Sequence, residues 1–196
     1  MAFVLAVFFV LLPFAGIDGA DFAQDAPSAA QPMSVPSRFV PVQGVTLADR
    51  LRAAVAAGRS TGGRYWAAYG FDVRRGVAVD FEWRNTNGVS KLEGLTIRNG
   101  GLETPNVAVF LQYDGASEQP KRVEIYNLDR KRTYGDLPVY WMGRADSGES
   151  LALLRGLLGS EEPEVVATRS IVAISLHADP RAEEILESIV MRGERE

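Results

Sequence analysis

The spacing of hydrophobic residues changes twice along this chain. Residues 1–15 form one apolar run, residues 65–128 alternate apolar stretches with turn sequences, and residues 139–191 repeat apolar positions at helical intervals. Alternation with a period of two is typical of strands, and apolar positions at i, i+3 and i+4 are typical of helices. The pattern predicts an α+β protein, a small antiparallel β-rich domain followed by C-terminal α-helical hairpins.

The N-terminal run is shorter than the roughly 20 residues that a membrane-spanning helix needs. Its length is typical of the apolar part of an export signal. We interpret residues 1–20 as a signal peptide or N-terminal hydrophobic segment, with a buried N-terminal helix as the alternative. Residues 21–44 are rich in Ala, Pro, Gln and Ser and predict a flexible linker. We therefore expect a periplasmic or secreted bacterial protein with no stable membrane span after processing.

The β-rich domain is predicted over residues 45–136, with a short helix at its start. Thr46 and Asp49 have the spacing of a capping box, and Gly58 is placed to end the helix in the left-handed conformation. The segment 76–83 alternates, so that Ala78, Asp80 and Glu82 face solvent in the prediction. Strands are expected at 65–73, 76–83, 106–113 and 122–128, with a weaker one at 92–97.

Helices are predicted over residues 137–196. Pro138 suits a first helical turn, and Asp146 suits the N-cap of the helix that follows. Pro163 opens a further helix, and Asp179 caps the last one. The pair Ala145-Asp146 recurs 33 residues later as Ala178-Asp179, a period typical of stacked helical hairpins.

Residues 139–191 resemble HEAT-type repeats of the short variety found in bacterial proteins. The resemblance rests on the two Asp-capped turns that follow an alanine, on a leucine-rich second helix, and on the sequence Glu-Glu-Pro-Glu-Val-Val at residues 161–166. It covers about a quarter of the chain. The resemblance implies protein–protein scaffolding. Some members of the family are bilin lyases, but no residue here supports carrying that activity over.

Composition excludes several classes of protein. The chain has 46% hydrophobic and 23% charged residues, as globular proteins do, and no cysteine, so it forms no disulfide. Its net charge of −4 divides into +4 for residues 38–142 and −5 for residues 143–196. Neither excess is large enough to indicate nucleic-acid binding.

Candidate catalytic groups are few. His177 is the single histidine, which excludes a zinc site because such sites need about four ligands. We expect it to be a solvated turn residue, without an evident serine partner for nucleophilic catalysis. The glycines of residues 58–63 have the spacing of a phosphate loop, but Arg64-Tyr65 replaces the required Lys and Ser/Thr. We therefore predict no catalytic residue, no metal and no cofactor, and expect a non-enzymatic protein.

Two functions remain, with a structural or stress-response protein lacking a single partner as a third. The first is a scaffold or adaptor that binds another protein of the bacterial envelope, for which Arg155, Arg169 and Trp141 are the candidate contacts. The second is a carbohydrate-binding, peptide-binding or hydrolytic domain. Its candidate ligand-binding residues are Asp80, Glu82, Trp66 and Trp83.

Two further observations bear on the second function. Tyr65 and Tyr69 cannot share a strand face with Trp66, so at least one of these aromatic side chains is expected to point outward. The basic turn at residues 129–132 suits an anionic lipid or an acidic polymer, or is simply solvated.

Overall fold

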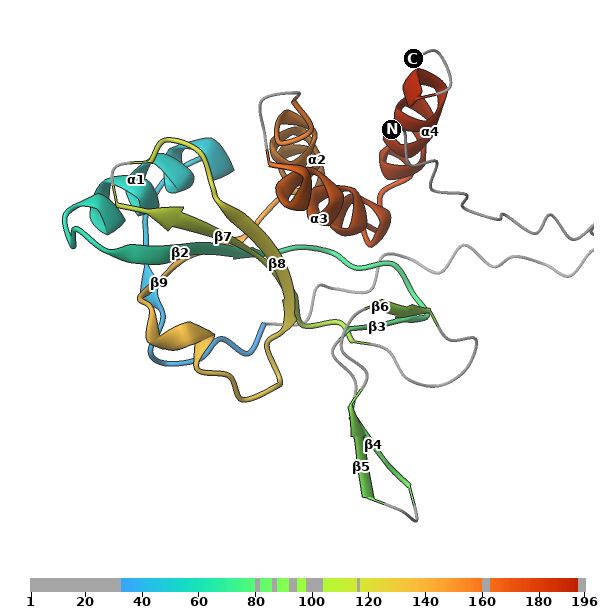
Figure 1. Ribbon diagram of the computed structural model, residues 1–196, viewed down its shortest axis with the longest axis horizontal. Coiled ribbons are helices and arrows are strands. Elements are labelled where there is room, and N and C mark those ends of the chain that lie inside the picture. The colour runs from blue at the N-terminus through green and yellow to red at the C-terminus, as the bar shows by residue number, and fades with distance from the viewer. Residues whose placement is uncertain are drawn as a thin grey trace, which may run out of the picture. The chain divides into compact units, whose positions relative to one another are not determined.

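The computed structural model describes residues 33–79, 82–85, 88–91, 95–97, 104–115, 117–159 and 163–193. The fold is α+β, and within these residues it combines a mixed five-stranded sheet with four α-helices, as Figure 1 shows. The helices are α1 Leu47–Arg59, α2 Ser147–Gly156, α3 Glu164–Ser175 and α4 Arg181–Gly193.

The five-stranded sheet has the spatial order β1 Val40–Pro41, β9 Val139–Arg144, β2 Arg64–Gly70, β7 Val107–Asp114 and β8 Arg122–Asn127. Strands β1 and β2 run parallel to β9, whereas β7 is antiparallel to both β2 and β8. Two separate ribbons pair β3 Val77–Val79 with β6 Leu95–Ile97, and β4 Glu82–Asn85 with β5 Gly88–Lys91.

The last strand of the sheet corrects two predictions. Residues 139–144 form β9, so the helix predicted to start at Pro138 is wrong, and the sheet extends past the expected boundary at residue 136. The aromatic and β-branched sequence Val139-Tyr140-Trp141 favours a strand. Pairing with β1 on one side and β2 on the other supplies its backbone hydrogen bonds. The sheet is therefore mixed rather than antiparallel.

Two more segments differ from their predictions. The expected linker includes β1, and Phe39 beside it is only 6% exposed, because the chain from Met33 onward packs on the sheet. Residues 21–32 lie outside the described part of the chain. The single strand expected over 76–83 is divided between β3 and β4, which belong to different ribbons. Ala78 is buried rather than solvated.

The start of α1 follows the prediction, but its end does not. Thr46 Oγ1 accepts a hydrogen bond from the backbone N–H of Asp49, and the Asp49 carboxylate accepts one from the N–H of Thr46, which completes the capping box. Gly58 lies inside the helix, and Ser60 is the C-cap. A Cβ atom at Gly58 would lie 2.3 Å from the Tyr65 ring. This glycine therefore allows close packing of α1 on β2.

The sheet is buried on both faces. Tyr65, Ala67 and Tyr69 of β2 belong to the larger hydrophobic cluster, which includes residues of α1, α2 and α3. Trp66 and Ala68 belong to a second cluster on the opposite face, formed with residues 33–39 and 128–139. The aromatic residues of β2 do divide between two faces. None points outward, however, because Trp66 is 3% exposed and Tyr65 and Tyr69 are 0% exposed.

We expect Gly58→Ala to destabilise the protein by about 1–3 kcal/mol, because the added methyl group forces Tyr65 or α1 to move. Gly156→Ala is the matched control, since a Cβ atom at Gly156 meets nothing within 4 Å. Chemical denaturation of both variants measures the difference. Equal free energies of unfolding would show that α1 does not depend on this close approach.

Candidate functional site

The predicted site residues fall on different parts of the fold. Asp80 lies outside the described residues, and Glu82 and Trp83 lie in β4, of which only the backbone is described. Trp66 is on the sheet face opposite the helices. A shared pocket of the two acidic residues with Trp66 or Trp83 therefore stays a prediction.

The candidate partner-binding residues are also spread. Arg155 is exposed near the end of α2, and Arg169 is exposed on α3. Trp141 lies in β9, half-buried against Phe39 with a ring distance of 5.9 Å. Of the three, Arg155 lines a hollow.

That hollow is a groove along α2, α3 and α4, which we call the helical groove. It consists of two adjoining pockets of about 460 and 410 Å³ that share Arg155, Gly156 and Ile185. The other lining residues are Gly148, Leu151, Ala152, Leu158, Gly159, Ala167, Ile171, Arg181, Ser188 and Ile189. Apolar and small residues predominate, which leaves room for a neighbouring backbone to approach closely.

The 33-residue sequence repeat also marks an exposed surface at the far end of α4, outside the groove. Asp146 Oδ1 accepts hydrogen bonds from the N–H groups at the start of α2, and Asp179 Oδ1 accepts one from the N–H of Arg181 at the start of α4. Both aspartates thus bind the start of a helix, although Asp146 follows strand β9 and Asp179 follows α3. The exposure of the repeat-related residues at the far ends of α2 and α4 differs. Leu157 after α2 is 6% exposed, whereas its counterpart Val190 on α4 is 60% exposed. Among the described residues, no helix covers this end of α4 as α3 covers α2.

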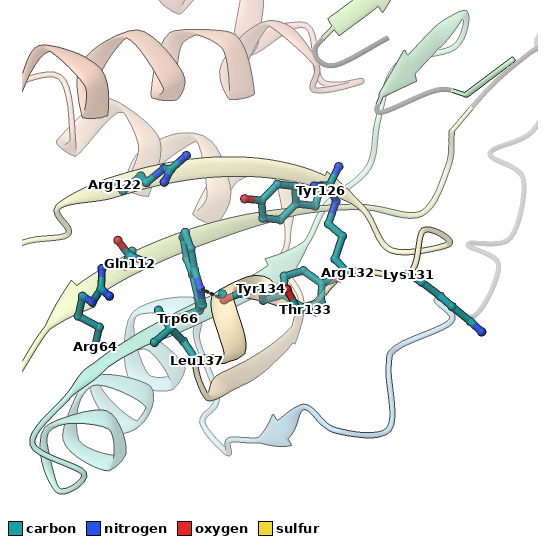
Figure 2. Close-up of a pocket in the computed structure, with 11 residues that line it drawn as sticks. Arg64, Trp66, Gln112, Arg122, Tyr126, Lys131, Arg132, Thr133, Tyr134 and Leu137 are labelled. Carbon is teal, nitrogen blue, oxygen red and sulfur yellow. Dashed lines mark hydrogen bonds between the residues drawn. The ribbon is translucent and has the colours of Figure 1, made fainter. Parts of the chain in front are cut away.

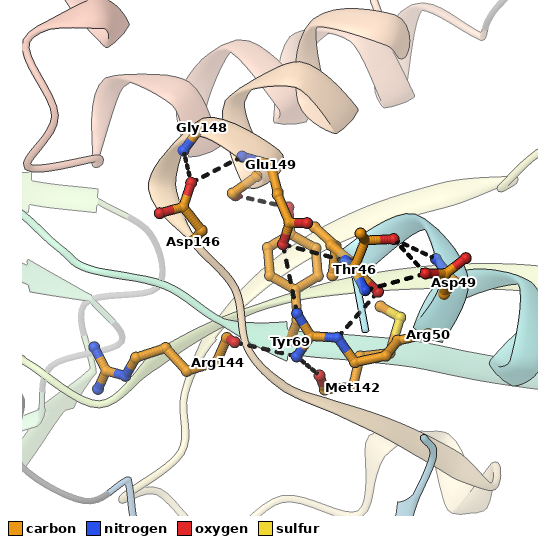
Figure 3. A network of polar contacts seen from close by, with 11 residues as sticks. Thr46, Asp49, Arg50, Tyr69, Met142, Arg144, Asp146, Gly148 and Glu149 are labelled. Carbon is orange, nitrogen blue, oxygen red and sulfur yellow. Dashed lines mark hydrogen bonds and ion pairs between the residues drawn. The ribbon is translucent and has the colours of Figure 1, made fainter. Parts of the chain in front are cut away.

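One guanidinium links α2 to the rest of the fold, as Figure 3 shows. Arg50 of α1 donates hydrogen bonds to the carbonyl oxygens of Met142 at 2.5 Å and Arg144 at 3.2 Å. It also lies 3.6 Å from the carboxylate of Glu149 in the first turn of α2. Glu149 in turn accepts a hydrogen bond from the N–H of Leu47 at the start of α1. These contacts position α1, β9 and α2 relative to one another.

A buried hydrogen-bond chain corrects the prediction for His177. The residue is 3% exposed rather than solvated, its ring stacks on Phe71 at 4.3 Å, and it does have a serine partner. Its Nε2 lies 2.8 Å from Ser150 Oγ, which lies 3.1 Å from the Tyr69 hydroxyl. Ser150 precedes His177 by 27 residues without any recognisable motif, so this pair cannot be identified from local sequence.

The protons of this chain can be assigned from its partners. Nδ1 of His177 lies 2.8 Å from the carbonyl oxygen of Ala173, which can only accept, so Nδ1 carries a proton. In the neutral ring Nε2 then accepts from Ser150, and Ser150 accepts from Tyr69. Burial is the main cause that lowers the pKa of His177 and keeps the ring neutral.

The same geometry argues against a serine nucleophile. Ser150 is 0% exposed beneath the helices, so no substrate carbonyl can reach its oxygen. The third group of the chain is a backbone carbonyl rather than a carboxylate that could stabilise an imidazolium. The chain Tyr69–Ser150–His177 therefore joins β2 to α2 and to the end of α3.

A second hollow lies on the opposite face of the sheet, and Figure 2 shows it. This basic pocket of about 540 Å³ is lined by Arg64, Trp66, Gln112, Arg122, Tyr126 and residues 131–135 and 137. Trp66 Nε1 donates a hydrogen bond of 2.9 Å to the carbonyl oxygen of Tyr134 and so holds the loop onto β2. Trp66 and the basic turn are separate candidates in the sequence, and the fold brings them together in this pocket.

The loop of the basic pocket has an unusual backbone. Tyr134, Gly135 and Asp136 have φ values of 54°, 68° and 55°, three consecutive residues in the left-handed region. That conformation costs roughly 1–2 kcal/mol for each non-glycine residue. Stacking of the Tyr134 ring on Phe110 at 4.9 Å, together with the Trp66 hydrogen bond, offsets this cost. Such strain often accompanies a functional site.

The described residues show neither a metal-binding cluster nor a membrane-spanning helix. They contain no cluster of three or more His, Asp or Glu side chains arranged to hold a metal ion. Nor do they include a helix with the length and apolar character needed to cross a bilayer.

The His177 environment predicts a pH dependence of stability. Because folding lowers the pKa of His177 below its ordinary value of 6.5, the unfolded chain binds more protons between those two pKa values. The free energy of unfolding is therefore expected to decrease as the pH falls from 6.5 toward the folded-state pKa. Urea denaturation between pH 7.5 and 5 measures the slope.

His177→Gln is the control for that slope. As the chain has one histidine and no cysteine, this variant should lose the slope between about pH 7 and 5. The separate loss of stability in acid should persist, because the hydrogen bonds from Arg181 lower the pKa of Asp179 to about 2. An unchanged slope in the variant would assign the pH dependence to other groups.

Comparison of the chain with known protein families, with curated proteins and with solved structures gives no match.

Proposed function

We propose that this chain is a non-enzymatic interaction module that binds another protein of the bacterial envelope through its C-terminal helices. The observation that carries the proposal is the uncovered end of α4, where Val190 and Met191 are 60% and 56% exposed. The equivalent Leu157 and Leu158 after α2 pack into or against the core. A partner element placed on α4, as α3 is placed on α2, would bury this surface.

The helical groove indicates the chemistry of that partner. Its floor presents Ile185 and Ile189 of α4 at helical spacing, and Gly156 opposite them carries no side chain. Arg155 lines both pockets of the groove and makes no ion pair with any described residue. An amphipathic helix with an apolar stripe and an acidic residue near Arg155 fits these features.

The place of action is part of the same proposal. It rests on the apolar run at residues 1–15 and on the absence of cysteine. Both are properties of the sequence, because residues 1–32 lie outside the described part. The HEAT resemblance supports scaffolding in the same way, although residues 139–144 at its start form β9 rather than a helix.

The test is capture of partners from the native cell envelope by the tagged chain, compared between variants. Gly156→Tyr should place a ring in the helical groove, at a position where a Cβ atom meets nothing within 4 Å. Met191→Glu places a charge on the uncovered end of α4. Each variant should lose the captured protein while its free energy of unfolding changes by less than about 1 kcal/mol.

Two controls keep the result specific. Gly63→Tyr also adds a ring where a Cβ atom meets nothing within 4 Å, but it lies in the loop before β2. Arg75→Glu reverses an exposed charge in the turn before β3, outside the groove. Both controls should retain the partner. A protein that is captured equally by all four variants would not be bound through this surface, and the proposal would fail.

A further inference from the structure

The basic pocket collects positive charge from segments that are distant in the sequence. Arg64 comes from the start of β2, Arg122 from the start of β8, and Lys131 and Arg132 from the loop before β9. No carboxylate is among its lining residues. A neighbouring hollow of about 340 Å³ shares the loop and adds Arg38 and Arg130. Gathering like charges is unfavourable unless an anion compensates them.

Sheet register places the polar groups of the pocket in a row. Trp66 pairs with Gln112 across β2 and β7, and Gln112 pairs with Arg122 across β7 and β8. An indole ring, an amide and a guanidinium therefore lie side by side on one face of the sheet. Figure 2 shows this row with the loop residues facing it.

Carboxylates close to the pocket neutralise only part of its charge. Glu124 lies 2.5 Å from Arg122 and pairs with it. Asp129, in the neighbouring hollow, accepts a hydrogen bond of 2.7 Å from the Asn106 amide. Arg64 and Lys131 are exposed and make no ion pair within the described part of the chain.

We propose that the basic pocket is an oxyanion-binding site for a small polar molecule, such as a phosphorylated or carboxylated sugar. Guanidinium groups bind phosphate and carboxylate through paired hydrogen bonds, and three of the four lining cations are arginines. Gln112 and Thr133 add hydrogen-bonding groups for the neutral part of the ligand. A volume of about 540 Å³ is within the range of small-molecule sites.

The backbone of the loop supports the same assignment. The left-handed residues 134–136 are separated from Lys131 and Arg132 by Thr133 alone, and the loop places these cations beside β2 and β8. The Arg132 guanidinium lies over the Tyr126 ring at 4.4 Å, so its position is fixed before a ligand arrives. A preorganised cation loses less conformational entropy on binding.

Isothermal titration of the full chain tests the proposal with four probes: glucose 6-phosphate, glucuronate, inorganic phosphate and glucose. At least one anionic probe should bind with a dissociation constant below about 1 mM, and glucose should not bind. Tighter binding of glucose 6-phosphate than of glucuronate would identify the ligand's anionic group as a phosphate. The reverse preference would identify it as a carboxylate. Equal affinity for inorganic phosphate and glucose 6-phosphate would identify the ligand as the free ion.

Variants locate the binding. Arg64→Gln and Lys131→Gln change exposed side chains and should each weaken binding roughly tenfold or more. Glu124→Gln removes the carboxylate that competes for Arg122 and should tighten binding. Arg169→Gln, the matched control on α3, should leave the affinity unchanged.

Three outcomes would overturn the oxyanion site. One is the absence of binding by every anionic probe to the folded chain. Another is equal affinity for glucose and its 6-phosphate. The last is a loss of affinity for the anionic probe in Arg169→Gln that is as large as the loss in Arg64→Gln. Such a result would indicate general charge attraction rather than a site.

Discussion

Both candidate surfaces depend on strand β2, because the two faces of that strand are buried against different parts of the chain. Tyr69 points toward the helices and contacts Ser150, which binds His177. Trp66 points to the other face and holds the loop of the basic pocket through the carbonyl of Tyr134. A slip of one residue in the register of β2 would exchange the two faces. That register therefore sets the position of the helical groove and of the basic pocket together.

A bulge in β9 fixes the register. Ala68 pairs with Trp141 but Gly70 pairs with Arg144, so two residues of β9 are accommodated opposite Tyr69. Gly143 makes this possible with a φ of 76°, and the bulge presents the carbonyl oxygens of Met142 and Arg144 to Arg50. A side chain at this glycine would begin 3.1 Å from Nη1 of that arginine. The guanidinium thus stabilises the irregularity on which the alignment of β2 and β9 depends.

Short-range features were predictable and long-range ones were not. The capping box at Thr46, the N-cap at Asp146 and the strands β7 and β8 follow from patterns within a few residues. The assignment of residues 139–144 failed because their pairing with β1 and β2 depends on segments about 70 to 100 residues earlier. The pocket cations are separated in the same way, and only register brings Arg122 into line with Trp66. Helix capping depends on residues within one turn of the chain. The gathering of the pocket cations depends instead on how distant strands pair in the sheet.

The distribution of charge limits how each surface can bind. The segment 143–196, which contains the groove helices, carries a net −5, so a strongly acidic partner would be repelled at long range. Recognition by the helical groove and the adjoining exposed end of α4 must then rest on burial of Ile189, Val190 and Met191, and an acidic residue beside Arg155 would set orientation rather than affinity. Residues 38–142 carry a net +4 and supply every cation of the basic pocket, so there attraction and local contacts act in the same direction. Raising the ionic strength should therefore separate the two surfaces, because screening weakens the oxyanion site and leaves the apolar groove largely unaffected.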